Sequence, residues 1–278
     1  MTDYLNDVCD LADLDFVSAY DEVPLWSAMF GLVLLDHVPL KPNVTALDVG
    51  SGLGFPALEL AERLGPSCHV YAIDPWKPAV VRARQKAQIR KVANVRLVDG
   101  DAAAMPFDDA RFDLIVSNVG INNFEDRRAV FGECGRVARP GASLVMTTNL
   151  RGHMEEFYDV YDATLRQLGK EARLAALRKH VNHRVTRAEV SDLLTAARFR
   201  VRRVDEQRGT MRFLDGTALL RHSFIKLGFL DAWRRVVTPD EEQAVFARLE
   251  ENLNRLARER GELALTIPMA CVVAEKAD

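Results

Sequence analysis

A short apolar run that ends in three closely spaced glycines is the feature that most constrains the fold of this chain. Residues 44–49 read VTALDV, which is the pattern of a buried parallel strand. A tight turn with positive φ, which lets a ligand approach bare backbone, is expected at Gly50, Gly52 and Gly54. Pro56 suits a first helical position, and residues 57–64 carry an apolar stripe at helical spacing. The stretch therefore predicts a strand, a glycine turn and a helix whose free N–H groups point over the turn.

The same alternation of strand and helix continues along the chain. Further apolar runs that predict strands lie at residues 69–74, 94–98, 111–118 and 142–148. Helical patterns separate them, chiefly at residues 77–90 and 124–138. Strands that alternate with helices form a parallel sheet with right-handed crossovers. The predicted fold class is therefore α/β, with a doubly wound, Rossmann-like, mostly parallel sheet.

Two ligand classes use such a glycine turn, and the spacing of the glycines favours one of them. The dinucleotide fingerprint G-x-G-x-x-G would place its third glycine at position 55, which is Phe55. The carboxylate of Asp48 suits a cationic ligand better than a pyrophosphate. Asp74 ends the second strand, where an acid can accept two hydrogen bonds from a ribose diol in either ligand class. A nicotinamide-dependent oxidoreductase therefore stays as the alternative, beside a turn that binds no ligand.

The run from Asp48 to Gly54, DVGSGLG, resembles motif I of the class I S-adenosylmethionine-dependent methyltransferases. Three later segments resemble the same family in the same order, namely Asp101-Ala102, Phe112 to Ile115 and Arg139 to Gly141. The resemblance covers residues 44–146 and is closest to the small-molecule, type 11-like members. It implies a seven-stranded sheet with an antiparallel last strand, S-adenosyl-L-methionine as cofactor and S-adenosyl-L-homocysteine as product.

The resemblance also implies which residues hold the cofactor. The glycine turn would hold the methionine part, an acid at Asp101 would meet the adenine amino group, and the N–H of Ala102 would meet a ring nitrogen. The expected cofactor-binding residues are Asp48, Gly50, Ser51, Gly52, Gly54, Asp74, Pro75, Trp76, Asp101, Ala102 and Asn118. Two of them have simpler interpretations, because Asp74 could cap the next helix and Asp101 could be a solvated loop acid.

Beyond residue 149 the resemblance weakens. In this family the sixth and seventh strands pair as an antiparallel hairpin, but the candidate strands here, residues 199–205 and 267–274, are separated by an insertion too long for a loop. The predicted domains are an N-terminal helical cover at 1–43, a methyltransferase core at 44–210 and 266–278, and a helical cap at 211–265. The alternative hypothesis is that residues 211–265 form the subunit interface of a homodimer.

An acceptor pocket is expected where the cap and the N-terminal cover would lie over the carboxyl ends of the strands. The predicted substrate-binding residues are Tyr20, Trp26, Phe213 and Phe224, with Leu214 beside them. The catalytic candidates are Asn122, which follows the fourth strand, and His222, because an unperturbed histidine titrates near neutrality. For most of these residues, packing in a hydrophobic core is the simpler interpretation.

Composition narrows the range of partners. The chain has 37 Lys and Arg against 40 Asp and Glu, a formal net charge of −3, so we expect no general attraction to nucleic acid. Four scattered cysteines are typical of reduced thiols in the cytoplasm, and residues 1–15 lack the features of a signal peptide. The apolar runs are too short to span a membrane. No metal is expected, because His180, His183 and His222 lack a further ligand of matching spacing.

The sequence therefore predicts an S-adenosylmethionine-dependent methyltransferase that transfers a methyl group by SN2 to a small or lipid-like molecule. In such a reaction the protein mostly aligns donor and acceptor and excludes water, and it needs a general base only if the acceptor must lose a proton. RNA or protein methylation and a non-catalytic binding module on the same fold are the remaining alternatives.

Overall fold

The computed structural model describes residues 2–6, 10–23 and 25–278, and the chain forms two compact units. The first, which we call the sheet unit, consists of Leu11–Asn149, Val185–Gln207 and Met269–Asp278. The second, which we call the helical unit, consists of Met1–Asp10, Leu150–Arg184 and Arg208–Pro268. Each unit is therefore assembled from three separate segments of the chain.

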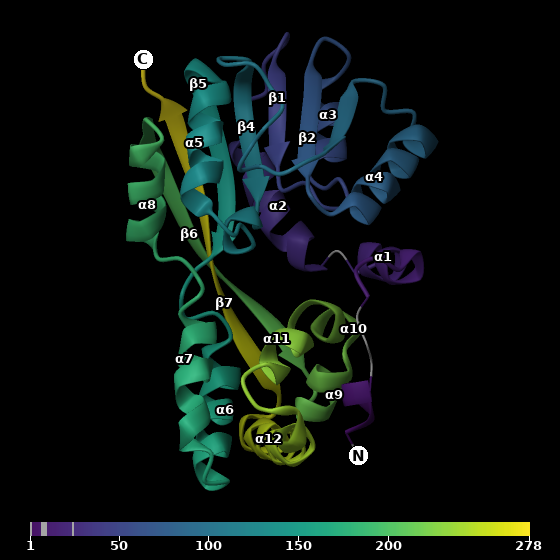
Figure 1. The fold of residues 1–278 in the computed structure, drawn as a ribbon, viewed down its shortest axis with the longest axis vertical. Coiled ribbons are helices and arrows are strands. Elements are labelled where there is room, and N and C mark those ends of the chain that lie inside the picture. The colour runs from purple at the N-terminus through teal and green to yellow at the C-terminus, as the bar shows by residue number, and fades with distance from the viewer. Residues whose placement is uncertain (1, 7–9, 24) are drawn as a thin grey trace. The chain divides into compact units, whose positions relative to one another are not determined.

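The sheet has seven strands in the order β3-β2-β1-β4-β5-β7-β6 (Figure 1). The parallel strands are β1 (Thr45–Val49), β2 (His69–Asp74), β3 (Val95–Asp99), β4 (Phe112–Asn118) and β5 (Ala138–Asn149). Strand β7 (Leu263–Lys276) is antiparallel to β5. The strand order reverses between β1 and β4, and such a switch point is where open α/β sheets bind ligands. The predicted fold class, including the antiparallel last strand, is confirmed.

Helices cover both faces of the parallel strands. On one face lie α2 (Leu25–His37), α3 (Ala57–Leu64) and α4 (Lys77–Arg90), which share an apolar core with Ala46, Leu114 and Val145. On the other face α5 (Arg127–Val137) and α8 (Arg187–Ala196) share a core with Leu47, Ile115 and Leu144. Adjacent residues of one strand thus enter opposite cores, because side chains alternate across a strand.

Strand β6 (Phe199–Phe213) is much longer than the predicted segment 199–205. It lies beside β7 and runs antiparallel to it, since Ala277 N–H donates to Arg198 O at one end and Arg212 pairs with Glu262 at the other. The expected hairpin-like pairing of the last two strands is therefore confirmed. Residues after Gln207 of β6 and before Met269 of β7 belong to the helical unit, so the strand continues into part of the predicted insertion.

The helical unit contains α6 (Glu155–Gln167), α7 (Leu174–Val181), α9 (Gly216–Arg221), α10 (Ser223–Ile225), α11 (Asp231–Arg234) and α12 (Pro239–Arg260), with the short turns η1 (Asp3–Asn6), η3 (Glu171–Arg173) and η4 (Lys226–Leu230). Its core is aromatic. The rings of Phe157 and Trp233 stack at 3.9 Å between centroids, and Tyr161 donates its hydroxyl to Trp233 O at 3.1 Å. Aromatic side chains bury large apolar areas, so a few of them can hold this unit together.

Several predicted helix boundaries were wrong, each for a local reason. The helical pattern of residues 152–169 predicts a helix from residue 152, but α6 begins at Glu155, because Gly152 and Met154 have φ values of +91° and +52°. The pattern of residues 216–227 likewise predicts one helix, but α9 ends at Arg221, since His222 is extended. Pro56 precedes α3 as its N-cap instead of occupying the first helical position. The run from Thr186 to Glu189 predicts a capping box, and the structure confirms it.

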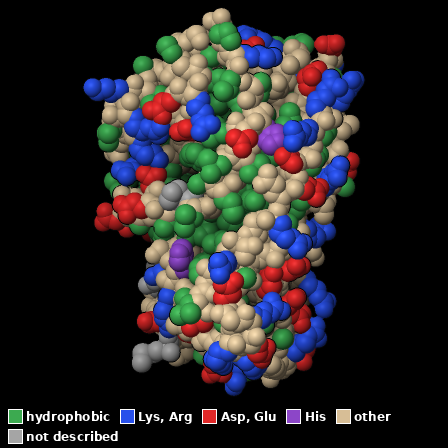
Figure 2. Space-filling view, turned by 180° about the vertical axis from the view of Figure 1, so that it is seen from behind, with side chains coloured by type: hydrophobic (Ala, Val, Ile, Leu, Met, Phe, Trp, Pro, Cys, Tyr) green, Lys and Arg blue, Asp and Glu red, His purple; other side chains and the backbone are tan. Residues whose placement is uncertain are grey.

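Charged side chains of both signs are interspersed over the face of the molecule in Figure 2. Many form ion pairs, such as Arg202 with Glu275 at 3.0 Å and Arg212 with Glu262. In the part of the chain that the structure describes, no helix combines the length and the apolar character needed to cross a membrane.

Candidate active site

The glycine turn joins β1 to α3 at the carboxyl edge of the sheet. The N–H groups of Gly50 and Ser51 both donate to Ile73 O, at 3.0 and 3.2 Å, and Gly54 N–H donates to Ser51 O at 2.8 Å. These bonds attach the turn to the end of β2, the strand that carries Asp74. The two sequence motifs therefore meet at one edge of the sheet.

Asp74 holds the turn through its carboxylate. It accepts from Gly52 N–H at 2.7 Å and from Trp76 N–H at 2.8 Å, one on each oxygen. Burial raises the pKa of this carboxyl, although both hydrogen bonds oppose the shift. Because a carboxylate offers about four acceptor positions, these two bonds leave capacity for a ligand's hydroxyl groups. Asp74 does not cap α4 directly, since the N-cap position belongs to Trp76.

Gly52 is the most open position of the turn. Its φ is +49°, and a Cβ added there would meet no atom of the other described residues within 4 Å. A side chain would therefore point into the space above the turn, where a ligand would lie. Gly54 differs, because a Cβ there would approach Ala83 of α4 to 3.0 Å, so this glycine serves close packing of the helix.

Two buried polar groups near the turn have no hydrogen-bond partner among the described residues. They are Asp48 Oδ1 and Ser51 Oγ, from side chains that are 0% and 2% exposed. The other Asp48 oxygen accepts from Ala57 N–H at 3.1 Å. Burial raises the pKa of Asp48 to about 8, and the nearby Asp74 charge adds to the shift. Buried polar atoms are rarely left unpaired, so this edge suits a ligand with polar groups, such as the methionine part of S-adenosylmethionine.

The expected adenine-binding residues lie on the loop after β3. Asp101 is exposed and accepts from Ala103 N–H at 2.8 Å, while Ala102 is buried in the core. Two other expected cofactor-binding residues, Pro75 and Trp76, follow β2. Pro75 is exposed, and Trp76 is half-buried with its Nε1 donating to Leu11 O at 2.7 Å. The carboxylate of Asp101 therefore remains accessible to an exocyclic amine.

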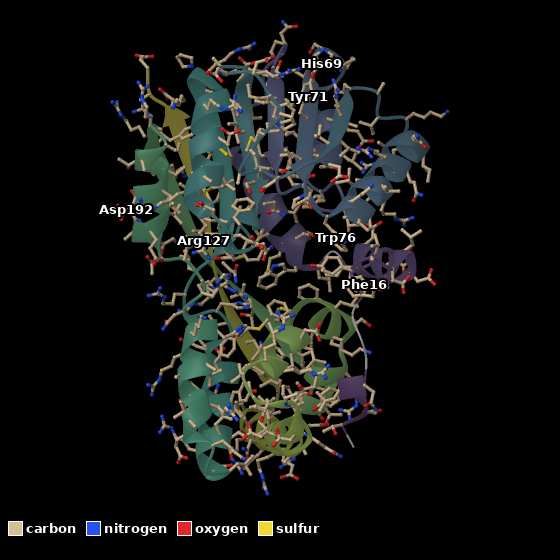
Figure 3. The ribbon with its side chains drawn as sticks, viewed as in Figure 1. Phe16, His69, Tyr71, Trp76, Arg127 and Asp192 are labelled. Atoms are coloured by element: carbon tan, nitrogen blue, oxygen red, sulfur yellow. The ribbon has the colours of Figure 1, made fainter. Side chains whose placement is uncertain are left out.

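An aromatic cluster forms at the carboxyl end of β2. The ring centroids of Tyr20 and Trp76 are 5.8 Å apart and those of Phe16 and Tyr20 are 6.2 Å apart. Figure 3 shows Phe16 and Trp76 near each other, at the opposite end of β2 from His69. Helix α1 (Leu14–Asp21) is held there by ion pairs from Asp21 to Arg82 and Lys86 of α4. Tyr20 thus lies at the Asp74 end of the site.

Trp26 belongs to a different part of the edge. The next residue, Ser27, accepts at its carbonyl from Asn118 Nδ2 at 2.9 Å, and Asn118 Oδ1 accepts from Thr147 Oγ1 at 2.7 Å. Asn118 is therefore fixed between α2 and β5 at the end of β4. This places the start of α2, including Trp26, near the switch point.

Asn122 lies in the turn η2 (Gly120–Asn122) and is 5% exposed. Its Nδ2 faces Thr148 Oγ1 at 3.0 Å, Asn149 O at 3.1 Å and Asn149 Oδ1 at 2.7 Å. Its Oδ1 accepts from Val185 N–H at 3.3 Å. An amide that is engaged on both ends within the protein is better suited to positioning than to direct catalysis.

The remaining candidates belong to the helical unit. The rings of Phe213 and His222 meet edge to face at 5.4 Å, and His222 Nδ1 has no hydrogen-bond partner among the described residues. Phe224 is 2% exposed and packs edge to face against Phe229 at 5.4 Å. Phe213 and His222 are therefore in contact, whereas Phe224 is part of the core of this unit.

The structure adds residues that the sequence analysis did not single out. Thr147, Thr148 and Asn149 end β5 and bind the two asparagines, and a polar triplet after the apolar run 142–146 is a signal that could have identified them. Phe16 stands four residues before Tyr20, so the helical spacing could have paired these two rings.

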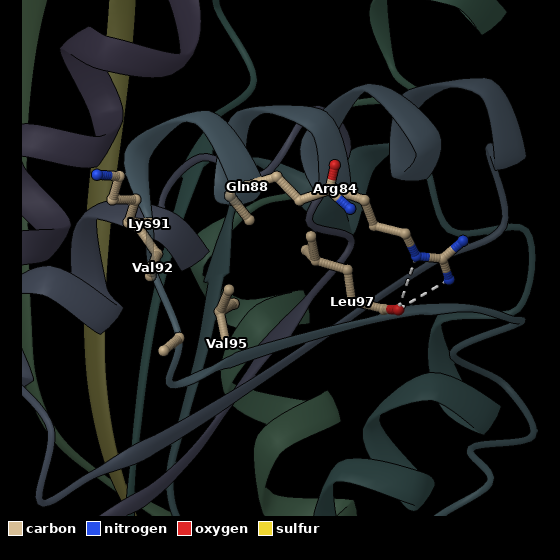
Figure 4. Close-up of a pocket in the computed structure, with 8 residues that line it drawn as sticks. Arg84, Gln88, Lys91, Val92, Val95 and Leu97 are labelled. Carbon is tan, nitrogen blue, oxygen red and sulfur yellow. Dashed lines mark hydrogen bonds between the residues drawn. The ribbon is translucent and has the colours of Figure 1, made fainter.

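Two other features lie outside this site. A shallow pocket of about 430 Å³ between α4 and β3 is lined by Ala87, Val92 and Leu97, and Arg84 crosses it to bind Leu97 O (Figure 4). It borders the start of β3, not its carboxyl end. His180 Nε2 lies 3.0 Å from the Tyr158 hydroxyl, and within the described ranges no three His, Cys, Asp or Glu side chains are placed to hold a metal.

Comparison with known proteins points to one family. A family model described as a methyltransferase domain matches residues 40–198, more than half of the chain. Demethylmenaquinone methyltransferase from Geobacillus sp. is 35% identical over 127 residues, which cover 46% of this chain and 54% of that protein. This chain thus spans about half the length of the curated relatives it matches.

Solved structures agree with the fold. An S-adenosylmethionine-dependent methyltransferase from Aquifex aeolicus superposes with a TM-score of 0.54 at 23% identity, over 69% of this chain and 91% of that one. A geranyl diphosphate methyltransferase, solved with geranyl diphosphate and sinefungin, superposes with a TM-score of 0.54 at 17% identity, over 89% of this chain and 77% of that one. The family match reaches residue 198, well beyond the segment that carried the sequence resemblance.

Proposed function

Because the chain belongs to the methyltransferase-domain family of class I S-adenosylmethionine-dependent enzymes, we propose that it transfers a methyl group to a small, lipid-like acceptor. One observation carries the cofactor side of this proposal. The buried Asp74 carboxylate accepts from Gly52 N–H at 2.7 Å, and a Cβ at Gly52 would meet no atom of the other described residues within 4 Å. That arrangement is a preformed cradle for a ligand with a ribose diol.

The residues of the cradle would each hold one part of S-adenosylmethionine. Asp74 would accept from the ribose hydroxyls and Asp101 from the adenine amino group. Asp48 Oδ1 and Ser51 Oγ, which have no hydrogen-bond partner among the described residues, would face the methionine part. Bound there, the cofactor supplies a sulfonium methyl that is already activated for transfer. The chain's own contribution is to align the acceptor with that methyl and to exclude water, which Asn118 supports by fixing the end of β4.

A small apolar or quinone-like acceptor is the class that we propose. Relatives include demethylmenaquinone methyltransferases, and a structural neighbour was solved with geranyl diphosphate. In this chain, residues 211–265 are a proposed acceptor-binding segment, with Phe213 as its apolar side chain. Tyr20 and Trp26 are the proposed substrate-binding residues of the sheet unit, whereas Phe224 is buried in the core of the helical unit. His222, in edge contact with Phe213, is the proposed base for acceptors that must lose a proton.

The cofactor part is tested by calorimetry. S-adenosylmethionine and S-adenosylhomocysteine should both bind to the purified chain with one site, and NAD should give no heat of binding. Binding of NAD alone would instead make the chain an oxidoreductase.

The acceptor part is tested with a short-chain demethylmenaquinol, by following S-adenosylhomocysteine formation. Phe213→Ala and His222→Ala should reduce methyl transfer while the affinity for S-adenosylmethionine stays near that of the wild type. Ile89→Ala is the matched control, because Ile89 lies on α4 and is 78% exposed. Full activity in both variants would remove these residues from the acceptor site. A dimeric mass by light scattering that is lost on altering residues 211–265 would assign the insertion to an interface instead.

A further inference from the structure

We propose that Asn122 is a positioning residue for methyl transfer, because its amide joins the turn after β4 to Asn149 and Val185, which stand at two of the places where the chain passes between the two units. This inference rests on the proposed function. Residues 150–184 belong to the helical unit, so Asn149 is the last residue before the chain leaves the sheet unit and Val185 is the first after it returns. Asn122 binds both of them.

The hydrogen bonds divide into two arms. The donor arm runs from Asn122 Nδ2 to Asn149, with Oδ1 at 2.7 Å and the carbonyl at 3.1 Å, and to Thr148 Oγ1 at 3.0 Å. The acceptor arm runs from Val185 N–H to Asn122 Oδ1 at 3.3 Å. A side-chain amide can donate through its nitrogen and accept through its oxygen, which an ionised carboxylate or a hydrocarbon cannot do.

The environment makes these bonds hard to replace by water. Thr148 and Val185 are fully buried, Asn149 is 3% exposed, and Val185 shares an apolar core with Ile121. The turn is held from its other side as well, because Arg127 Nε donates to Ile121 O at 2.9 Å. In a site without water, loss of either arm leaves buried polar groups without partners. The Asn122 hydrogen bonds to Thr148, Asn149 and Val185, which we call the clamp, therefore strongly favour the arrangement in which all of them are made.

The place of the clamp connects it to the reaction. Turn η2 follows Asn118 after one residue, at the carboxyl end of β4, which is the edge that carries the cofactor cradle. Strand β5 ends at Asn149, and the same residue pairs with Met269, where β7 enters the sheet unit. Asn149, Val185 and Met269, each at a place where the chain passes between the units, are thus connected to turn η2, the last through Asn149. Because the rate of methyl transfer depends steeply on small displacements of the reacting groups, holding these residues is a positioning role.

The test compares Asn122→Ala and Asn122→Asp with Asn123→Ala, since Asn123 is the exposed neighbour in the same turn. Asn122→Ala should lower kcat/KM for a short-chain demethylmenaquinol at least tenfold, with the dissociation constant for S-adenosylmethionine within twofold of the wild type. Asn122→Asp keeps the acceptor arm and loses the donor arm, so its kcat/KM should lie between those of Asn122→Ala and the wild type. Asn123→Ala should behave as the wild type does.

Hydrogen exchange separates this inference from the proposed acceptor. The amide of Val185 should exchange faster in Asn122→Ala than in Asn122→Asp, in which its acceptor is retained. If exchange accelerates but kcat/KM per folded enzyme is unchanged, Asn122 is merely structural and the inference is overturned. If the wild type does not methylate the quinol, the proposed acceptor is wrong. Independently of that result, an exchange rate at the Val185 amide that is unchanged in Asn122→Ala would overturn the inference about Asn122.

Discussion

The sheet unit and the helical unit hold their key side chains in different ways. In the sheet unit, polar side chains at the ends of strands bind backbone N–H groups, as Asp74 does with Gly52 and Trp76. In the helical unit, aromatic rings pack on one another around Trp233, and polar groups such as the Tyr161 hydroxyl serve that core. The comparison suggests that the first unit is built to present backbone to a ligand and the second to enclose apolar surface.

The largest effect should come from filling the open position of the glycine turn. Gly52→Val places a side chain in the ligand space and in a backbone conformation with φ of +49°. We expect S-adenosylmethionine binding to weaken by roughly 100-fold or more, measured by calorimetry. Gly141→Val is the matched control, because Gly141 has φ of +75° and equally open surroundings near the start of β5. Equal losses in both variants would mean that strain alone, not the ligand, is responsible.

Removing the carboxylate that holds the turn should have the next largest effect. Asp74→Ala deletes the acceptors of the ribose diol and leaves two N–H groups without their partner. The expected loss of cofactor affinity is about 1.5–3 kcal/mol, which corresponds to roughly 10- to 150-fold. Asp113→Ala is the control, since Asp113 accepts from Thr45 N–H at 2.9 Å at the other end of β1. It should lower the melting temperature and leave the affinity unchanged.

One buried group in each unit should make the stability of the protein depend on pH, with opposite signs. In the helical unit this group is His180. Burial lowers its pKa to about 4, so an unfolded chain binds this proton at higher pH than the folded one. The stabilisation is complete above the ordinary histidine pKa near 6.5 and is lost as the pH falls toward about 4. Between pH 7 and 5 the wild type should therefore lose more thermal stability than His180→Asn does. His69→Asn, at an exposed histidine of β2, should follow the wild type.

In the sheet unit, Asp48 should make stability fall as the pH rises. Its pKa is raised to about 8 by burial, so the folded chain keeps a proton that the unfolded chain releases near pH 4. Without cofactor, the wild type should become less stable relative to Asp48→Asn as the pH rises from 5 to 8, with no further change above that. Asparagine can still accept from Ala57 N–H, so the fold is kept. A melting-temperature difference that is independent of pH would show that Asp48 is ionised in the folded protein.

The smallest effect is expected at a helix end away from the site. Thr186 Oγ1 accepts from Glu189 N–H at 3.2 Å, and Glu189 returns a bond to Thr186 N–H. Thr186→Ala should cost about 1 kcal/mol in the free energy of unfolding, with no effect on cofactor binding. Thr195→Ala on the same helix is the control, because the Thr195 hydroxyl donates to Ser191 O in the interior of the helix. Its stability should stay within about 0.5 kcal/mol of the wild type.

The sequence by itself determined the sheet, the glycine turn and the family. Strands and helices follow local periodicity, and the turn depends on adjacent residues, so residues 44–64 carry their structure with them. Boundaries were less certain wherever one residue changed the backbone, as Met154 and His222 do. The extension of β6 to Phe213 could not be seen either, because it depends on pairing with a strand that lies far along the chain.

Only the tertiary structure decided which polar side chains meet. Asp74 and Gly52 are 22 residues apart, and Asn122 and Val185 are 63 apart, so no local pattern pairs them. The physical reason is that a buried polar group must find a partner wherever the packed chain brings one, whereas a helix or strand needs only its own apolar period. The hydrogen bonds of Asn122 to Asn149 and Val185, which flank residues 150–184, meet that requirement.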